Sequence, residues 1–223
     1  MSGLPPASVP PTSGPVPDRP VAPTSGPGPA TAVPPMPGSR RAALQRARMV
    51  LVAGVAGGVG TTTVAALLAD AVGGRLGVTV QATDHSGGEL AARLPRLEAA
   101  TSRVAVHDAG AHPGPAAALS AAPERSLVVV GRATADGVAD VRTVLATLPD
   151  TDPTLLGRSA VVLVDRASRP TAVDPAALRE TGVGAVLVLR ADRTLARPGR
   201  IAVDRLTPST IGTVTDLLAA LAW

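Results

Sequence analysis

Short apolar runs alternate with longer stretches of helical spacing from residue 49 to the end of the sequence. The runs are rich in Val, Leu and Ala, and they cover residues 49–53, 77–82, 103–107, 126–130, 160–164 and 185–189. Strands that are apolar at successive positions are buried on both faces, and strands that alternate with helices pair in parallel. The pattern therefore predicts an α/β fold, with a mostly parallel sheet of about six strands and helices on both faces.

Two of the intervening helices have clear boundary signals. Residues 62–72 run into Gly73 and Gly74, a pair that predicts the end of a helix. In residues 207–223, Pro208 suits a first helical position. One face of this last helix carries an apolar stripe of Ile211, Val214, Leu217, Leu218 and Leu221. Such a stripe predicts packing onto the sheet.

The composition changes in the N-terminal part of the chain. Residues 1–38 contain thirteen Pro and five Gly, and almost no large apolar side chain interrupts them. A segment of this kind cannot bury enough surface to offset its conformational entropy. We therefore predict a disordered proline-rich arm over residues 1–44 and one folded domain over 45–223. The arm suits a spacer, or alternatively a docking peptide for an aromatic-lined groove of a protein partner.

The net charge of +4 lies at the N-terminal side. Residues 1–49 hold five Arg and one Asp, whereas residues 50–223 hold sixteen Arg and sixteen acids. A neutral domain argues against a broad nucleic-acid surface. The basic end of the arm, formed by Arg40, Arg41, Arg46 and Arg48, is a candidate contact for DNA or an anionic membrane. The absence of interleaved aromatic residues favours the alternative of a solvated segment.

Two residue types that carry much site chemistry are absent. The chain has no Cys, which excludes disulfides and thiolate metal sites, and it has no Lys. No apolar run is long enough to predict a membrane span, and the N-terminus lacks the apolar core of a secretory signal. These features favour a cytoplasmic protein.

A glycine-rich loop follows the first predicted strand. Residues 54–63 read Gly-Val-Ala-Gly-Gly-Val-Gly-Thr-Thr-Thr and lead into a helix. Glycines let the backbone wrap closely around an anion, and the helix N-terminus offers unpaired N–H groups. The alternative is a tight turn without a ligand, but three glycines in this spacing before three threonines favour phosphate binding.

This loop resembles that of the MinD/ParA family of deviant Walker ATPases, which reads Lys-Gly-Gly-x-Gly-Lys-Thr-Thr. Ala56 stands at the position of the signature lysine, and Thr61 stands at the position of the phosphate-binding lysine. The resemblance implies a P-loop fold whose nucleotide-binding residues are Gly57, Gly58, Gly60, Thr61, Thr62 and Thr63. A loop without lysines is similar to the CpaE/TadZ-like branch, whose members help position pilus or secretion machinery.

Acidic residues end the second and third predicted strands. By resemblance, Asp108 and Thr62 serve a Mg²⁺ ion, and Asp84 lies near the attacking water if the protein is catalytically active. The family usually shows Asn for reading adenine near the position where this chain has Asp165. The identity of the base therefore stays open.

The missing lysines weaken the case for catalysis. They neutralise the β- and γ-phosphates in the family, and without them little stabilises charge on the transferring phosphoryl group. We expect a non-hydrolysing adaptor or positioning factor for secretion, pilus or division machinery, which binds ATP and Mg²⁺ weakly or not at all. By resemblance it forms a homodimer.

Two other functions compete with this expectation. One is an active ATPase switch in which threonine hydroxyls or an arginine replace lysine; Arg132, Arg166 and Arg190 all follow predicted strands at the same sheet edge. The other is a nucleoid-associated protein that holds DNA through its basic segment.

The three histidines, His85, His107 and His112, lie near predicted strand ends beside Asp84 and Asp108. A His/Asp metal site is one interpretation. However, His107 and Asp108 are consecutive on a strand, so their side chains point to opposite faces. We therefore predict solvated loop histidines.

Overall fold

The structure, a computed structural model, describes residues 48–87, 89–95, 102–167 and 173–223. The predicted arm over 1–44 lies outside the described residues, as do Arg40, Arg41 and Arg46. The predicted domain is therefore described from Arg48 onward.

Six strands form one sheet, and every neighbouring pair is parallel. In chain order they are β1 (Arg48–Gly54), β2 (Gln81–Asp84), β3 (Val104–Asp108), β4 (Arg125–Arg132), β5 (Ala160–Val164) and β6 (Ala185–Leu189). Their order across the sheet is β2-β3-β1-β4-β5-β6. Since β1 lies between β3 and β4, the chain changes direction across the sheet there, which is where ligands bind in open α/β sheets.

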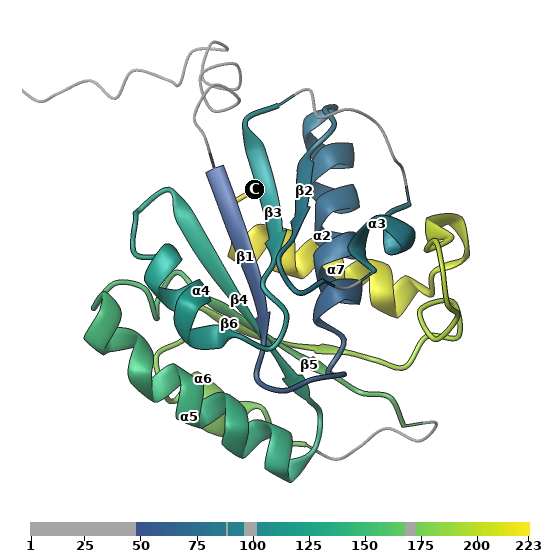
Figure 1. The fold of residues 1–223 in the computed structure, drawn as a ribbon. Helices are drawn as coiled ribbons and strands as arrows, with labels where there is room; N and C mark the ends of the chain where they lie inside the picture. Colours follow the sequence, from purple (N-terminus) through teal and green to yellow (C-terminus); the bar gives the residue numbers. More distant parts are fainter. Residues whose placement is uncertain (1–47, 88, 96–101, 168–172) are drawn as a thin grey trace, which may run out of the picture. The chain divides into compact units, whose positions relative to one another are not determined.

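Helices cover both faces of the sheet (Figure 1). The helices are α2 (Thr61–Leu76), α3 (Leu90–Arg93), α4 (Pro113–Leu119), α5 (Ala135–Thr151), α6 (Ala176–Arg179) and α7 (Pro208–Ala220), with a short 3₁₀ turn η1 (Val203–Arg205). Val50 and Val52 of β1 pack with α2 and α7, whereas Leu51 and Ala53 pack with α4, α5 and α6. Successive residues thus enter two separate cores, which confirms the predicted α/β fold with helices on both faces.

The boundary between α2 and β2 differs from the prediction. The helix continues through Gly73 and ends only at Gly77, whose φ is 69° and whose N–H bonds to the Gly73 carbonyl. The chain then folds back over the helix, and a Cβ on Gly73 would lie 2.8 Å from the carbonyl oxygen of Val78. Gly73 therefore permits a close approach inside the helix instead of ending it, and the strand predicted at 77–82 begins at Gln81.

The last helix confirms its predicted start and its packing. The Thr207 side chain caps it by accepting a hydrogen bond from Thr210 N, and Pro208 opens the first turn. Leu217 and Leu218 are buried against the sheet, but Ile211 at the other end of the stripe is 51% exposed.

Arg48 joins the two ends of the described domain. Its guanidinium donates to the carbonyl oxygens of Leu221 and Ala222, each at 3.0 Å, and lies 4.0 Å from the centre of the Trp223 ring. These contacts hold the residues that follow α7, and a contact of the basic segment with DNA or a membrane stays a prediction.

None of the helices in the described part of the chain combines the length and the apolar character needed to span a bilayer.

Candidate functional site

The glycine loop connects β1 to α2 at the C-terminal edge of the sheet. Gly58 and Gly60 have φ values of 70° and 104°, a left-handed conformation that favours glycine. Gly54 donates to the carbonyl of Gly110 at 2.7 Å, and Val55 donates to the carbonyl of Val130 at 2.9 Å. The loop is therefore anchored to the segment after β3 and to β4 before it enters the helix.

The start of α2 is open to an anion. Gly60 occupies its N-cap position, no side chain caps the helix, and no acidic residue lies in its first turn. The first N–H groups of a helix lack partners within the helix and carry partial positive charge. A glycine loop that leads into such an uncapped helix is suited to hold a phosphate group.

Thr61 packs toward the inside of the loop. Its side chain is 8% exposed, and a Cβ on Gly54 would lie only 2.3 Å from its Oγ1 atom. The hydroxyl thus occupies the space above Gly54, and the glycine at that position is required. Thr62 and Thr63, one and two residues further along, are partly exposed. Ala56 is exposed and carries no polar side-chain atom, so the two positions that the resemblance assigns to lysine carry no charge.

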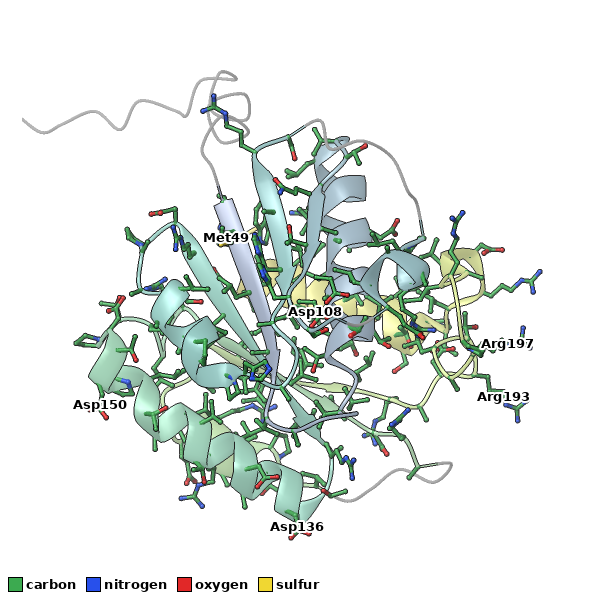
Figure 2. All side chains as sticks on the ribbon, in the orientation of Figure 1. Met49, Asp108, Asp136, Asp150, Arg193 and Arg197 are labelled. Atoms are coloured by element: carbon green, nitrogen blue, oxygen red, sulfur yellow. The ribbon has the colours of Figure 1, made fainter. Side chains whose placement is uncertain are left out.

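Asp108 ends β3 and is fully buried. It pairs in register with Val52 of β1, so it lies one strand away from the loop (Figure 2). Its Oδ1 accepts a hydrogen bond from Gly110 N at 2.9 Å, whereas its Oδ2 is buried without a hydrogen-bond partner. A buried carboxylate oxygen without a partner is unfavourable unless a ligand, ion or water satisfies it.

The unpartnered Oδ2 of Asp108 suits the magnesium site that the resemblance implies, and the assignment of Asp108 and Thr62 to that ion stays a prediction. Mg²⁺ binds through one or two oxygen groups of the protein and keeps several waters or phosphate oxygens. Asp108 Oδ2 would accept from a metal-bound water, and the Thr62 hydroxyl in the first turn of α2 would be the second oxygen. Among the described residues no group of three or more His, Asp or Glu could hold an ion by itself, so the phosphate would complete the coordination.

Asp84 ends β2 and pairs in register with Asp108. Its Oδ1 accepts hydrogen bonds from the N–H and the hydroxyl of Ser86, both at 2.8 Å, and its Oδ2 accepts from Leu90 N at 3.2 Å. The carboxylate therefore shapes the loop between β2 and α3. Its assignment as the acid near an attacking water stays a prediction.

A cavity of about 170 Å³ lies beside the loop, between the ends of β5 and β6. Its apolar walls are Val164, Leu189 and Leu195, and its polar groups come from Asp165, Arg166 and Arg190. Pockets of this kind, mostly apolar with a few fixed polar groups, are typical of sites for small organic ligands. Its residues also include Gly60 and Thr63, so the cavity adjoins the glycine loop and the first turn of α2.

Asp165 is held in place at the base of this cavity. Its side chain is 3% exposed, and its Oδ2 lies 3.4 Å from Arg190 Nη1. Its Oδ1 accepts from Ala167 N at 3.0 Å, and its own N–H donates to Leu189 O. These bonds fix the backbone from which Arg166 extends.

Arg93 is a functional candidate that sequence reasoning missed. It ends α3, is 8% exposed, and donates to the carbonyls of Leu195 (2.8 Å), Gly199 (3.1 Å) and Arg197. It also donates to Thr63 Oγ1 at 3.2 Å. Arg93 therefore fastens the segment between β6 and α7 over the first turn of α2. The sequence carried no signal for it, because Arg93 lies more than 100 residues from these carbonyls and is one of 21 arginines.

The prediction of solvated loop histidines was wrong for one of the three residues, His107; His85 is exposed in the loop after β2, although it contacts His107. His107 lies within β3 and is partly buried, and its Nδ1 is 2.7 Å from Nε2 of His85. The two rings are tilted by only 10°. His112, at the N-cap of α4, is exposed as expected. Parallel register explains the pair, because it places Thr83, the second residue before His85, opposite His107.

The histidine pair is expected to make the domain less stable in acid. Burial lowers the pKa of His107 from its ordinary value of 6.5, and the charges of His85 and Arg125 lower it further. Protonation then favours the unfolded chain, so this contribution to stability is present above pH 6.5 and is lost as the pH falls through the folded-state pKa. An NMR titration of the imidazoles should give a midpoint for His107 below 6.5, which rises in His85→Ala. A wild-type midpoint at or above 6.5 would contradict the prediction.

Comparison with known proteins gives similarity in structure but not in sequence. No protein-family model matches the chain, and no curated protein matches it either. A ParA family ATPase from Chlorobium tepidum TLS superposes with a TM-score of 0.58 at 14% identity, covering 80% of this chain and 100% of that one. A protein described as a plasmid partition protein from Borrelia burgdorferi B31, bound to AMPPNP, gives a TM-score of 0.51 at 10% identity over 79% and 98%. Together with the glycine loop between β1 and α2, these likenesses identify the fold of the described chain as the P-loop fold of the ParA-family ATPases.

Proposed function

We propose that this protein binds a nucleotide in the glycine loop without hydrolysing it, and acts as an adaptor or positioning factor of the MinD/ParA type. The observation that carries the proposal is a contrast between the groups in and around the glycine loop. The uncapped start of α2 and the unpartnered Oδ2 of Asp108 are suited to a phosphate and its magnesium ion. Ala56 and the inward-packed Thr61 offer no charge to a transferring phosphoryl group.

The cavity beside the loop supports a nucleotide rather than a simple anion. A base would lie between Val164, Leu189 and Leu195, with the phosphates directed toward Gly60 and the first turn of α2. The structural likeness to a partition protein bound to AMPPNP supports the same class of ligand. Binding is expected to be weak, because backbone N–H groups remain in the loop but lysine charge does not.

The positioning role rests on the resemblance to the CpaE/TadZ-like branch. We propose that the protein works in the cytoplasm, with the folded domain pairing as a homodimer and the proline-rich arm over residues 1–44 reaching a protein partner. A nucleoid-associated role is less well supported, since Arg48 is already engaged by Leu221, Ala222 and Trp223. Salt-sensitive DNA binding that requires residues 1–48 would favour that role instead.

The proposal predicts nucleotide binding without turnover. In the purified full-length protein, calorimetry should detect ADP binding, whereas phosphate release from ATP with Mg²⁺ should stay at background. The Asp108→Ala variant is the control, because it removes the carboxylate assigned to the metal. Phosphate release should be the same in both proteins. Magnesium-dependent turnover in the wild type that disappears in Asp108→Ala would establish the active ATPase switch instead.

A further inference from the structure

Arg166 is the only one of three candidate arginines at the sheet edge whose described contacts reach the phosphate loop. Its Nη1 donates to the carbonyl oxygen of Gly58 at 3.0 Å. Arg190 instead pairs with the buried carboxylate of Asp165. Arg132 is exposed and borders neither of the two hollows beside the loop. The sequence predicted all three arginines at one sheet edge, and only their contacts show that Arg166 is the one beside the glycine loop.

The position of Arg166 is central to the site. It lines the 170 Å³ cavity next to β5 and β6, and it also lines a hollow of about 360 Å³ over the first turn of α2. Thr63 is shared by both hollows. A ligand that occupies the 170 Å³ cavity and extends onto the first turn of α2 must therefore pass Arg166.

The chemistry of the guanidinium suits a phosphate at this point. Arginine has five N–H donors in a planar fork that matches phosphate oxygens, and it stays charged. Within the described residues Arg166 makes one side-chain hydrogen bond, to Gly58, and this leaves further donors of the guanidinium for a ligand. Arg93 and Arg197 also line the 360 Å³ hollow, but neither lines the 170 Å³ cavity. Arg93 uses its hydrogen bonds to hold three carbonyls and Thr63. Of these three arginines, Arg166 is the one that is exposed, contacts the glycine loop and lines both hollows.

We infer that Arg166 supplies, from the segment after β5, the positive charge that the phosphate loop has lost at positions 56 and 61. The ligand chemistry is a pyrophosphate group, either free or as part of a nucleoside diphosphate. This inference rests on the proposed function, since it names a binding residue for the same site. The charge would act on binding and would not restore hydrolysis, since it comes from outside the loop.

The test measures the affinity of the full-length protein for ADP, inorganic pyrophosphate and adenosine by calorimetry. Arg166→Gln keeps a donor for Gly58 but removes the charge, and Arg166→Lys keeps the charge. Arg132→Gln is the matched control, because Arg132 lies at the same sheet edge outside both hollows. We expect Arg166→Gln to weaken ADP and pyrophosphate binding about tenfold. Adenosine binding and the melting temperature should not change, Arg166→Lys should retain part of the affinity, and Arg132→Gln should match the wild type.

The salt dependence of the affinity distinguishes two roles of Arg166: a charge that attracts the ligand, and a hydrogen bond that only holds Gly58 in place. The difference between wild type and Arg166→Gln should shrink as the salt concentration rises from about 0.05 M to about 0.5 M, because ions screen an exposed charge. Equal affinity of wild type and Arg166→Gln for both ligands would overturn the inference while leaving nucleotide binding intact. Arg166-dependent binding of pyrophosphate without ADP binding would overturn the proposed function alone. If the wild type binds neither ligand, both are wrong.

Discussion

Replacing Arg93 by alanine is expected to lower the free energy of unfolding by about 3 kcal/mol. The side chain is almost fully buried, and its loss leaves the carbonyls of Leu195, Arg197 and Gly199 without their donor. Removing one partner of a buried charge-assisted hydrogen bond is costly, because the other partner remains out of contact with water. Urea unfolding of the purified proteins measures the difference.

The matched control is Arg179→Ala. Arg179 also ends a helix of four residues, α6, but it is exposed. This control should change stability by no more than about 0.5 kcal/mol. Nucleotide binding should fall in Arg93→Ala and not in Arg179→Ala. The loss of Arg93 releases the segment between β6 and α7, and this segment carries Leu195, which lines the 170 Å³ cavity. If Arg93→Ala unfolds at the same urea concentration as Arg179→Ala, Arg93 does not fasten this segment.

Restoring a lysine in the loop by Thr61→Lys is expected to tighten the binding of ADP and pyrophosphate about tenfold to hundredfold. A charge-assisted hydrogen bond from the first turn of α2 would add to those that the backbone N–H groups at the start of α2 offer to a phosphate. Phosphate release from ATP should remain at background in this single variant, because position 56 is still alanine. Adding Ala56→Lys is expected to recover some turnover if the protein dimerises.

A control for this prediction adds the same charge elsewhere. Thr143 lies exposed on α5, which covers the opposite face of the sheet from α2. Thr143→Lys should therefore leave the affinity for ADP unchanged. An affinity that does not rise in Thr61→Lys, while its melting temperature matches the wild type, would show that the loop no longer holds phosphates.

The segment between β6 and α7 illustrates what sequence reasoning could not supply. Asp192 is buried there and accepts hydrogen bonds from Thr194 N, Thr207 N and Thr210 Oγ1. Burial raises the pKa of this carboxyl, but the hydrogen bonds together outweigh it and leave the pKa below its ordinary value. The aspartate thus joins the segment to the start of α7, and Arg93 joins it to α2. Figure 2 shows Arg193 and Arg197 on the outer side of this segment.

The sequence by itself determined the layered architecture. Runs of apolar residues such as 160–164 and 185–189 match β5 and β6 residue for residue. A strand that is apolar on both faces can be satisfied only between two helical layers, so the pattern required a covered parallel sheet. The glycine loop was also evident, because left-handed backbone and close approach require glycine at specific positions.

Only the tertiary structure decided which polar groups meet. His85 and His107, Arg166 and Gly58, and Arg93 and Thr63 are joined across 22, 108 and 30 positions of sequence. The local sequence pattern predicts whether a residue is buried, but it does not predict which residue it contacts. The contacts depend on the order of the strands and on the path of the connecting segments back to the sheet edge. Gly73 shows the same limit: its sequence context predicted a helix end, but the approach of Val78 made it a contact point inside a longer helix.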